Sequence, residues 1–135
     1  MINYDEFKKV EIRAGKIISA EKIPDTDKLL KLSVDFGTKI QPAKDPVQPD
    51  LDLGAELKPV SEKVLDIRQI VSGISLYFPD PAVLVGRTCM FVTNLELRTI
   101  KGFESNGMLF AVSTPEGGFS LLEPNESIPP GTMAA

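Results

Sequence analysis

Histidine is absent from all 135 residues of the chain, and its absence removes several kinds of chemistry. Without an imidazole there is no Ser-His-Asp or Cys-His nucleophile pair, no imidazole general base and no histidine-containing zinc site. Cysteine occurs once, at Cys89, so neither an internal disulfide nor a Cys-x-x-Cys pair can form. This cysteine usage is typical of proteins that fold in a reducing compartment.

Long apolar runs are missing too. No run approaches the roughly 20 residues needed to span a bilayer. The first residues, MINYDEFKKV, are polar and lack the apolar core of a signal peptide. We therefore expect a cytoplasmic protein that makes no membrane contact.

The glycine motifs of nucleotide-binding and hydrolytic enzymes are also absent. The 10 glycines form neither GxGxxG nor GxxxxGK[ST], and there is no GxSxG elbow. Two close acidic pairs, Asp25/Asp27 and Asp50/Asp52, fit solvated turns better than a metal site. We predict a non-catalytic chain with no cofactor and no bound metal.

The chain has no excess of positive charge. Fifteen Lys and Arg stand against 19 Asp and Glu, which gives a net charge of −4. This balance argues against a strongly basic nucleic-acid coat protein but permits a local basic face. Because every Lys and Arg lies at or before Lys101, such a face must be built from the first three quarters of the chain.

What the sequence does contain is a series of short strands. Apolar and polar residues alternate from Leu30 to Phe36, the period-2 pattern of a half-buried strand, and Gly37 follows. Similar segments are expected over 11–23, 66–71, 87–92, 107–113 and 119–122. Helix is limited to short turns near Tyr4–Lys9 and after Pro81. Many short strands with little helix favour a small all-β barrel over a sandwich or an α/β sheet.

Residues 38–65 interrupt this pattern. The interval holds four prolines (Pro42, Pro46, Pro49 and Pro59) and has no sustained apolar periodicity. Structureless connections of this length are uncommon in compact domains. We interpret it as a Pro-rich insertion within a single domain over 1–135, mostly extended and with a weak strand near Leu57 to Leu65. It is either a surface loop or a partner-binding arm.

A basic and polar set of side chains is the main candidate for function. Its members are Lys28, Lys31, Arg68, Arg98 and Lys101, with Asn94, Ser105 and Asn106 nearby in the sequence. In a closed barrel they would converge on one face. There Lys and Arg neutralise phosphates, while Asn and Ser read base or sugar edges. The alternative, an ordinary solvated surface, remains open on composition alone.

The string VTNLELRTIKGFESNGMLFA at 92–111 resembles the signature of the OB-fold tRNA-binding domain family. That family includes the C-terminal domain of bacterial methionyl-tRNA synthetases and free-standing structure-specific tRNA-binding proteins. Five further blocks are similar in order, at 7–17, 27–37, 68–74, 84–87 and 128–132. The resemblance covers the chain except for 38–65.

The resemblance implies a five-stranded OB barrel with short helices and a C-terminal extension. It also implies non-catalytic tRNA binding by shape, as an appended domain or subunit of methionyl-tRNA synthetase, and a homodimer formed through the C-terminal region. Such a module raises the local concentration of tRNA. By motif position, the tRNA contacts would fall on Lys31, Arg68, Asn94, Arg98, Lys101, Ser105 and Met108.

Two questions stay open within this resemblance. Met108 is equally well explained as a core residue of a strand. The same fold also occurs in related secretion-chaperone proteins that bind polypeptide, which is the alternative function. In the 94–108 block, Gly102, Ser105, Gly107 and Met108 agree with the tRNA-binding branch, so we favour tRNA.

Overall fold

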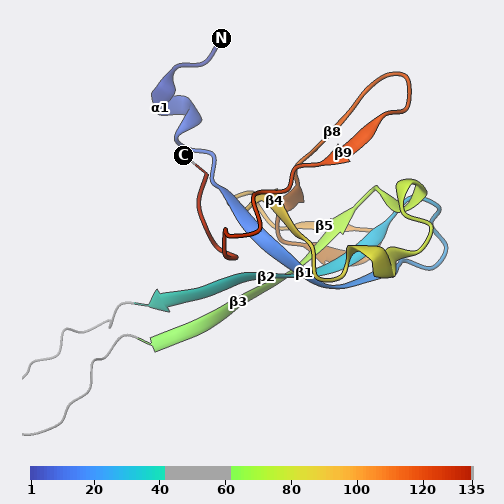
Figure 1. The fold of residues 1–135 in the computed structure, drawn as a ribbon, viewed down its shortest axis with the longest axis horizontal. Helices are drawn as coiled ribbons and strands as arrows, with labels where there is room; N and C mark the ends of the chain where they lie inside the picture. The colour runs from blue at the N-terminus through green and yellow to red at the C-terminus, as the bar shows by residue number, and fades with distance from the viewer. Residues whose placement is uncertain (42–61, 135) are drawn as a thin grey trace, which may run out of the picture.

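The computed structural model describes residues 1–41 and 62–134, and most regular structure in them is β (Figure 1). The strands are β1 (Ile12–Lys22), β2 (Leu30–Gln41), β3 (Glu62–Ser72), β4 (Thr88–Val92), β5 (Arg98–Ile100), β6 (Phe103–Ser105), β7 (Met108–Leu109), β8 (Ala111–Ser113) and β9 (Phe119–Leu121). The helical elements are α1 (Tyr4–Phe7) and the 3₁₀ turns η1 (Ser75–Tyr77) and η2 (Pro81–Leu84). In these residues no helix has the length and apolar character needed to cross a membrane.

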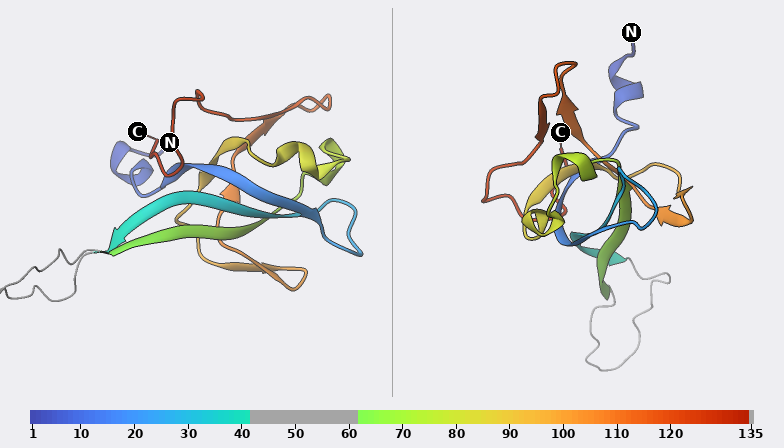
Figure 2. Two further views of the ribbon diagram at one scale, coloured as in Figure 1. Left: turned by 60° about the horizontal axis from the view of Figure 1, so that its bottom comes forward. Right: turned by 90° about the vertical axis from the view of Figure 1, so that its right-hand side faces the viewer.

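Five strands form one antiparallel sheet in the order β3-β2-β1-β4-β7. The right-hand view of Figure 2 shows this sheet curling into a ring. Two small hairpins, β5–β6 and β8–β9, and helix α1 project from the ring. The predicted five-stranded β-barrel is therefore confirmed.

The core fills the inside of the ring because the strands alternate as the sequence predicts. Leu30, Leu32, Val34 and Phe36 all point inward from β2 and are fully buried. Phe36 meets Phe91 of β4 edge to face, with ring centroids 5.4 Å apart. This is the favoured arrangement for a pair of aromatic rings.

The first strand is irregular at a position beyond Gly15. The register of β1 against β2 shifts between Ile17 and Ser19. At Gly15, a Cβ atom would lie 2.6 Å from side-chain atoms of both Phe36 and Val34. Gly15 is therefore required by the packing of the core rather than by the bulge.

The second strand is longer than the sequence predicts, and the third joins the end of the weak strand expected near Leu57 to Leu65 to the strand expected from Asp66. β2 continues past Gly37, which has φ +84°, to Gln41, and β3 begins at Glu62. The pairing slips between Asp35 and Thr38, so a bulge absorbs the glycine that was expected to end the strand. Both ends of the predicted insertion 38–65 are therefore strand, seen in Figure 1 as a ribbon leaving the barrel, and 42–61 lie outside the described residues.

The single strand predicted over 107–113 is wrong. The chain forms β7 against β4 and then β8 against β9, in different sheets. The change follows Leu109, the last residue paired with β4, and the Phe110 amide still donates to the Met90 carbonyl at 3.0 Å. The chain then leaves the barrel to build the β8–β9 hairpin.

Residues 130–134 act as a strap along the part of β1 that β2 leaves free. The Gly131 amide donates to the Ala14 carbonyl at 2.7 Å, and the Ala14 amide donates to the Thr132 carbonyl at 2.9 Å. Gly131 has φ +94°, and a Cβ there would lie 2.4 Å from the carbonyl oxygen of Phe36. Only glycine fits this position, so the path of the strap has a steric cause.

A buried ionic network lies beneath the strap. Asp66 accepts from Arg13 at 3.1 Å and from Arg68 at 3.0 Å, and its side chain is 7% exposed. Arg13 also donates to the carbonyl of Phe36, while Arg68 donates to the carbonyl of Thr93. One carboxylate thereby joins β1, β2, β3 and the end of β4.

Removing the Asp66 charge should destabilise the fold strongly. Asp66→Asn removes the carboxylate that Arg13 and Arg68 share and leaves Arg13 only its longer pair with Glu11 at 3.8 Å. We therefore expect a loss of about 3–5 kcal/mol, measured by urea unfolding. Glu123→Gln is the matched control, because its pair with Arg87 is more than a third exposed. Exposed pairs contribute about 0–1 kcal/mol. Equal losses in the two variants would contradict the network's role.

The thiol of Cys89 should be unreactive in the folded protein. Burial raises its pKa to about 11, with a further contribution from the Glu123 carboxylate. Since the thiolate is the nucleophile, alkylation by iodoacetamide at pH 8 should be far slower in native buffer than in denaturing urea. Equal rates under the two conditions would show that the thiol is accessible.

Candidate nucleic-acid interface

The β5–β6 hairpin carries the two basic residues of the signature string. Its turn places Lys101 at φ 51° and Gly102 at φ 85°, the pair of positive angles that defines a type I′ turn. This turn matches the twist of paired strands and holds Lys101 at the tip. Arg98 and Lys101 are both exposed. No ion pair involves either of them within 1–41 and 62–134.

Ser105 joins this hairpin to the barrel. It is 3% exposed, its Oγ accepts from the Val71 amide at 3.0 Å, and it donates to the Gly107 carbonyl at 3.1 Å. Next to it, the Asn106 amide donates to the Gln69 carbonyl at 2.8 Å. The predicted contact residue Ser105 therefore has its hydroxyl occupied inside the protein.

Lys31 lies where β2 meets the hairpin. Its Nζ is 3.3 Å from the Glu21 carboxylate and 5.2 Å from the centre of the Phe103 ring. A third of its side chain is exposed. Lys31 thus lies beside the hairpin, with its charge already paired to Glu21.

A cleft separates the tip of this hairpin from the β1–β2 loop. Its volume is about 450 Å³, and its lining residues are Asp25, Thr26, Asp27, Lys28, Leu29, Ile100 and Lys101. The loop is held from within, since the Thr26 hydroxyl donates to the Ile23 carbonyl and the Ile23 amide to the Leu29 carbonyl. This pairing of loops is where OB folds bind oligonucleotides.

Arg68 is not part of this surface. Its side chain is 13% exposed and its guanidinium is occupied by Asp66 and by the carbonyl of Thr93. Asp66, Arg68 and the buried Ile70 are spaced two residues apart along β3, so their side chains lie on the same face of the strand. This spacing in the sequence could have indicated that Arg68 points into the barrel.

Asn94 and Met108 take different positions. Asn94 is exposed, but its Oδ1 accepts from the Glu11 amide at 2.8 Å and its Nδ2 donates to the Lys9 carbonyl. Its amide therefore anchors the segment after α1 to the start of the 93–107 connection. Met108 pairs with Val92 and is 44% exposed, so it is a surface residue rather than part of the core.

The predicted residues thus divide into two groups. Four are accessible on or beside the hairpin: Arg98 and Lys101, Lys31 with its charge paired to Glu21, and the apolar Met108. Ser105, Arg68 and Asn94 instead hold the hairpin's connection to the barrel. Sequence reasoning missed the cleft, because Asp25 and Asp27 read as an isolated turn and nothing local predicts that Ile100 lies opposite them.

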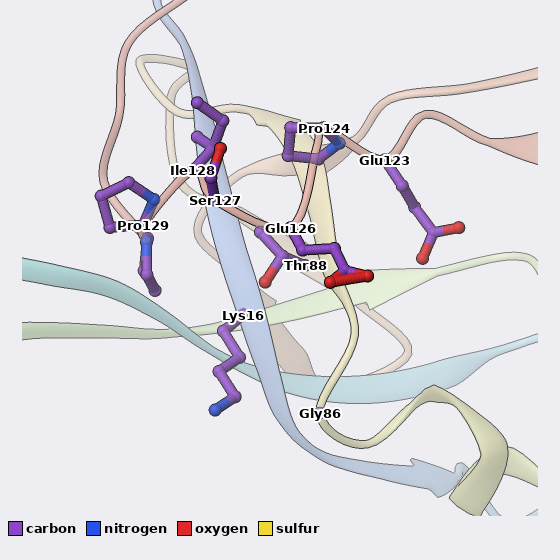
Figure 3. Close-up of a pocket in the computed structure, with 10 residues that line it drawn as sticks. Lys16, Gly86, Thr88, Glu123, Pro124, Glu126, Ser127, Ile128 and Pro129 are labelled. Carbon is purple, nitrogen blue, oxygen red and sulfur yellow. The ribbon is translucent and has the colours of Figure 1, made fainter.

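A second groove has the wrong charge for RNA. It runs between β1 and the 123–130 segment, with a volume of about 590 Å³ (Figure 3). Its lining includes the acidic residues Glu123 and Glu126 and one basic residue, Lys16. In Figure 3 the side chain of Lys16 points away from both carboxylates. Among the described residues no group of three His, Cys, Asp or Glu side chains is arranged to hold a metal ion.

A family model described as "Putative tRNA binding domain" matches residues 57–133. The methionine–tRNA ligase of Enterococcus faecalis is 32% identical over 134 residues, and that of Methanosphaerula palustris is 39% identical over 132. These alignments cover 99% and 98% of this chain but 16% and 15% of the ligases. The chain thus spans about a sixth of the length of these relatives.

Solved structures agree with the sequence matches. A MetRS-related protein from Pyrococcus horikoshii superposes with a TM-score of 0.75 at 32% identity, covering 100% of this chain and 98% of that one. The chaperone CsaA from Bacillus anthracis has a TM-score of 0.70 at 24% identity, with 100% and 99% covered, and it shows the fold alone. The family model covers more than half of the chain and the ligases align along nearly all of it. This chain therefore belongs to the tRNA-binding domain family, with the OB fold.

Proposed function

We propose that this chain binds tRNA without catalysing a reaction, through the β5–β6 hairpin, the adjacent surface of β2 and the β1–β2 loop. The main support for this proposal is the exposure of two positively charged side chains on the β5–β6 hairpin. A type I′ turn holds Lys101 exposed at its tip, with Arg98 exposed on the same hairpin. Both charges lack an ion-pair partner in the described chain, and both are therefore available to phosphates.

The binding we propose is by shape and charge. Phosphate contacts position a protein on RNA, and contacts with unpaired bases add discrimination. Lys31 and Met108 would extend the contact surface beside Arg98 and Lys101. We assign Arg68, Asn94 and Ser105 to holding the loops in place, because their polar atoms already bond within the protein.

We further propose that the domain serves a methionyl-tRNA synthetase in the cytoplasm, as part of its chain or as a subunit. The similarity to a sixth of the ligases supports this role. A tethered module needs only modest affinity, since linkage makes the second binding event intramolecular. The net charge of −4 fits modest rather than tight binding.

Removing the hairpin charges should weaken tRNA binding and reduce its salt dependence. Arg98→Ala removes one charge, and Lys101→Asn removes the other with a residue that tolerates positive φ. Each lost phosphate contact should lower the slope of log K against log salt by roughly 0.7–0.9. The measurement is a salt titration of tRNA binding by fluorescence anisotropy.

Lys16→Gln is the control for this series, because Lys16 is an exposed lysine in the acidic groove of Figure 3. It should leave the slope unchanged. An unaltered affinity and slope in the Arg98/Lys101 double variant would reject this site. Unfolded polypeptide is titrated in parallel, and binding of polypeptide with no tRNA binding at low salt would favour the chaperone-like alternative.

We propose in addition that the domain is a homodimer in which α1 is covered by the partner. A capping box formed by Asn3 and Glu6 starts α1, yet none of its residues is buried. Tyr4 is 72% and Phe7 47% exposed, and both line a groove with Met133 of the strap. A helix this short is unstable without tertiary packing, so a covering surface is needed.

Charging this surface should separate the two copies. Tyr4→Asp/Phe7→Asp is expected to sediment as a monomer where the unmodified chain sediments as a dimer, because two carboxylates would be buried without partners. Leu76→Asp, at another exposed apolar position (67%), is the control and should remain dimeric. Monomeric sedimentation of the unmodified chain at high micromolar concentration would contradict the proposal.

A further inference from the structure

The cleft beside the hairpin has an unusual set of charges for a surface that meets RNA. Two carboxylates, Asp25 and Asp27, line it together with the ammonium groups of Lys28 and Lys101. Within the described chain no ion pair neutralises any of the four. Carboxylates repel phosphate, so the part of the cleft that Asp25 and Asp27 line is unsuited to the RNA backbone. They accept hydrogen bonds but, when ionised, donate none.

The walls of the cleft are held in place before any ligand arrives. On one side, the Thr26 hydroxyl and amide both donate to the Ile23 carbonyl, and the Lys28 carbonyl accepts from the Ser75 amide at 2.9 Å. On the other side, the type I′ turn fixes Ile100 and Lys101. Leu29 and Ile100, each half-buried, supply apolar surface between the charged groups. The backbone on both sides of the cleft is therefore ordered before a ligand binds, which lowers the ordering cost of binding.

We propose that this cleft reads one unpaired nucleobase of the bound RNA and prefers guanine. The base would lie against Leu29 and Ile100, and the two lysines would contact the flanking phosphates. Guanine presents adjacent N1–H and N2–H donors to a carboxylate. Cytosine and adenine present one amino group, and uracil presents a single N–H between two acceptors. The preferred order is therefore guanine, then cytosine or adenine, then uracil.

This inference rests on the proposed tRNA-binding function, and it adds a sequence preference to binding by shape. Single-stranded and loop bases are the usual targets of base-specific RNA recognition, because their edges are free. The cleft volume of about 450 Å³ admits a nucleotide. The inference therefore concerns one unpaired position of a folded RNA, not the helical regions.

The test uses the pentanucleotides UUGUU, UUCUU, UUAUU and UUUUU, titrated into the unmodified chain and followed by amide chemical shifts, which detect millimolar binding. A two-donor contact with a carboxylate should make UUGUU bind about tenfold more tightly than UUUUU. The shifts should involve Leu29 and Ile100. Equal affinities, or no binding of any oligonucleotide at millimolar concentration, would overturn the inference.

Asp25→Asn/Asp27→Asn is the critical variant. Asparagine has nearly the same shape and tolerates the positive φ of Asp25 (65°). Its amide offers one donor and one acceptor and pairs with guanine and uracil edges alike, so the tenfold ratio should fall toward one. Glu116→Gln/Glu126→Gln makes the same change in net charge at exposed positions outside the cleft. It should raise all four affinities together and keep the ratio.

The result separates this inference from the function on which it rests. If tRNA binds with a steep salt dependence while the pentanucleotides show no base preference, the cleft inference fails alone. If tRNA does not bind at low salt, the proposed function fails with it. A guanine preference that survives in Asp25→Asn/Asp27→Asn would also overturn the inference, because groups other than these two carboxylates would then recognise the guanine.

Discussion

The buried carboxylate of Asp66 is the constraint on which the rest of this small barrel depends. Two guanidinium groups, from Arg13 and Arg68, are largely withdrawn from water and share it as their counter-ion. A buried charge is tolerated only when it is paired and its remaining hydrogen-bonding positions are filled. The backbone carbonyls of Phe36 and Thr93 fill them, and this fixes β2 and the end of β4 relative to β3.

The position of the proposed RNA-binding hairpin follows from the same strand. Arg68 holds the carbonyl of Thr93, where the connection to the hairpin begins, and Gln69 holds Asn106, where that connection returns. Val71 donates to the hydroxyl of Ser105 between them. Neighbouring residues of β3 thus attach both ends of the 93–107 connection to the barrel. Arg98 and Lys101, both exposed on this hairpin, are therefore positioned by hydrogen bonds that β3 makes beneath them.

The sequence predicts the barrel well because its cues are local. Alternation from Leu30 to Phe36 identifies an inward face, and Asn3 identifies the start of α1. The exposure of the candidate site residues was harder to predict, because charge alone does not distinguish Arg98, which is exposed, from Arg68, which is largely buried beside Asp66. The ribbon beyond Gly37 and the cleft between Leu29 and Ile100 depend on contacts between distant segments. No local pattern encodes such contacts.

If tRNA binds on the hairpin side of the barrel, amide hydrogen–deuterium exchange of the chain with and without tRNA will show where it lies. We expect slower exchange over 23–31 and 98–108 when tRNA is bound, with the acidic groove at 123–130 unchanged. Protection confined to 123–130, or to the segment around α1, would place the RNA on another face of the barrel and rule out the hairpin.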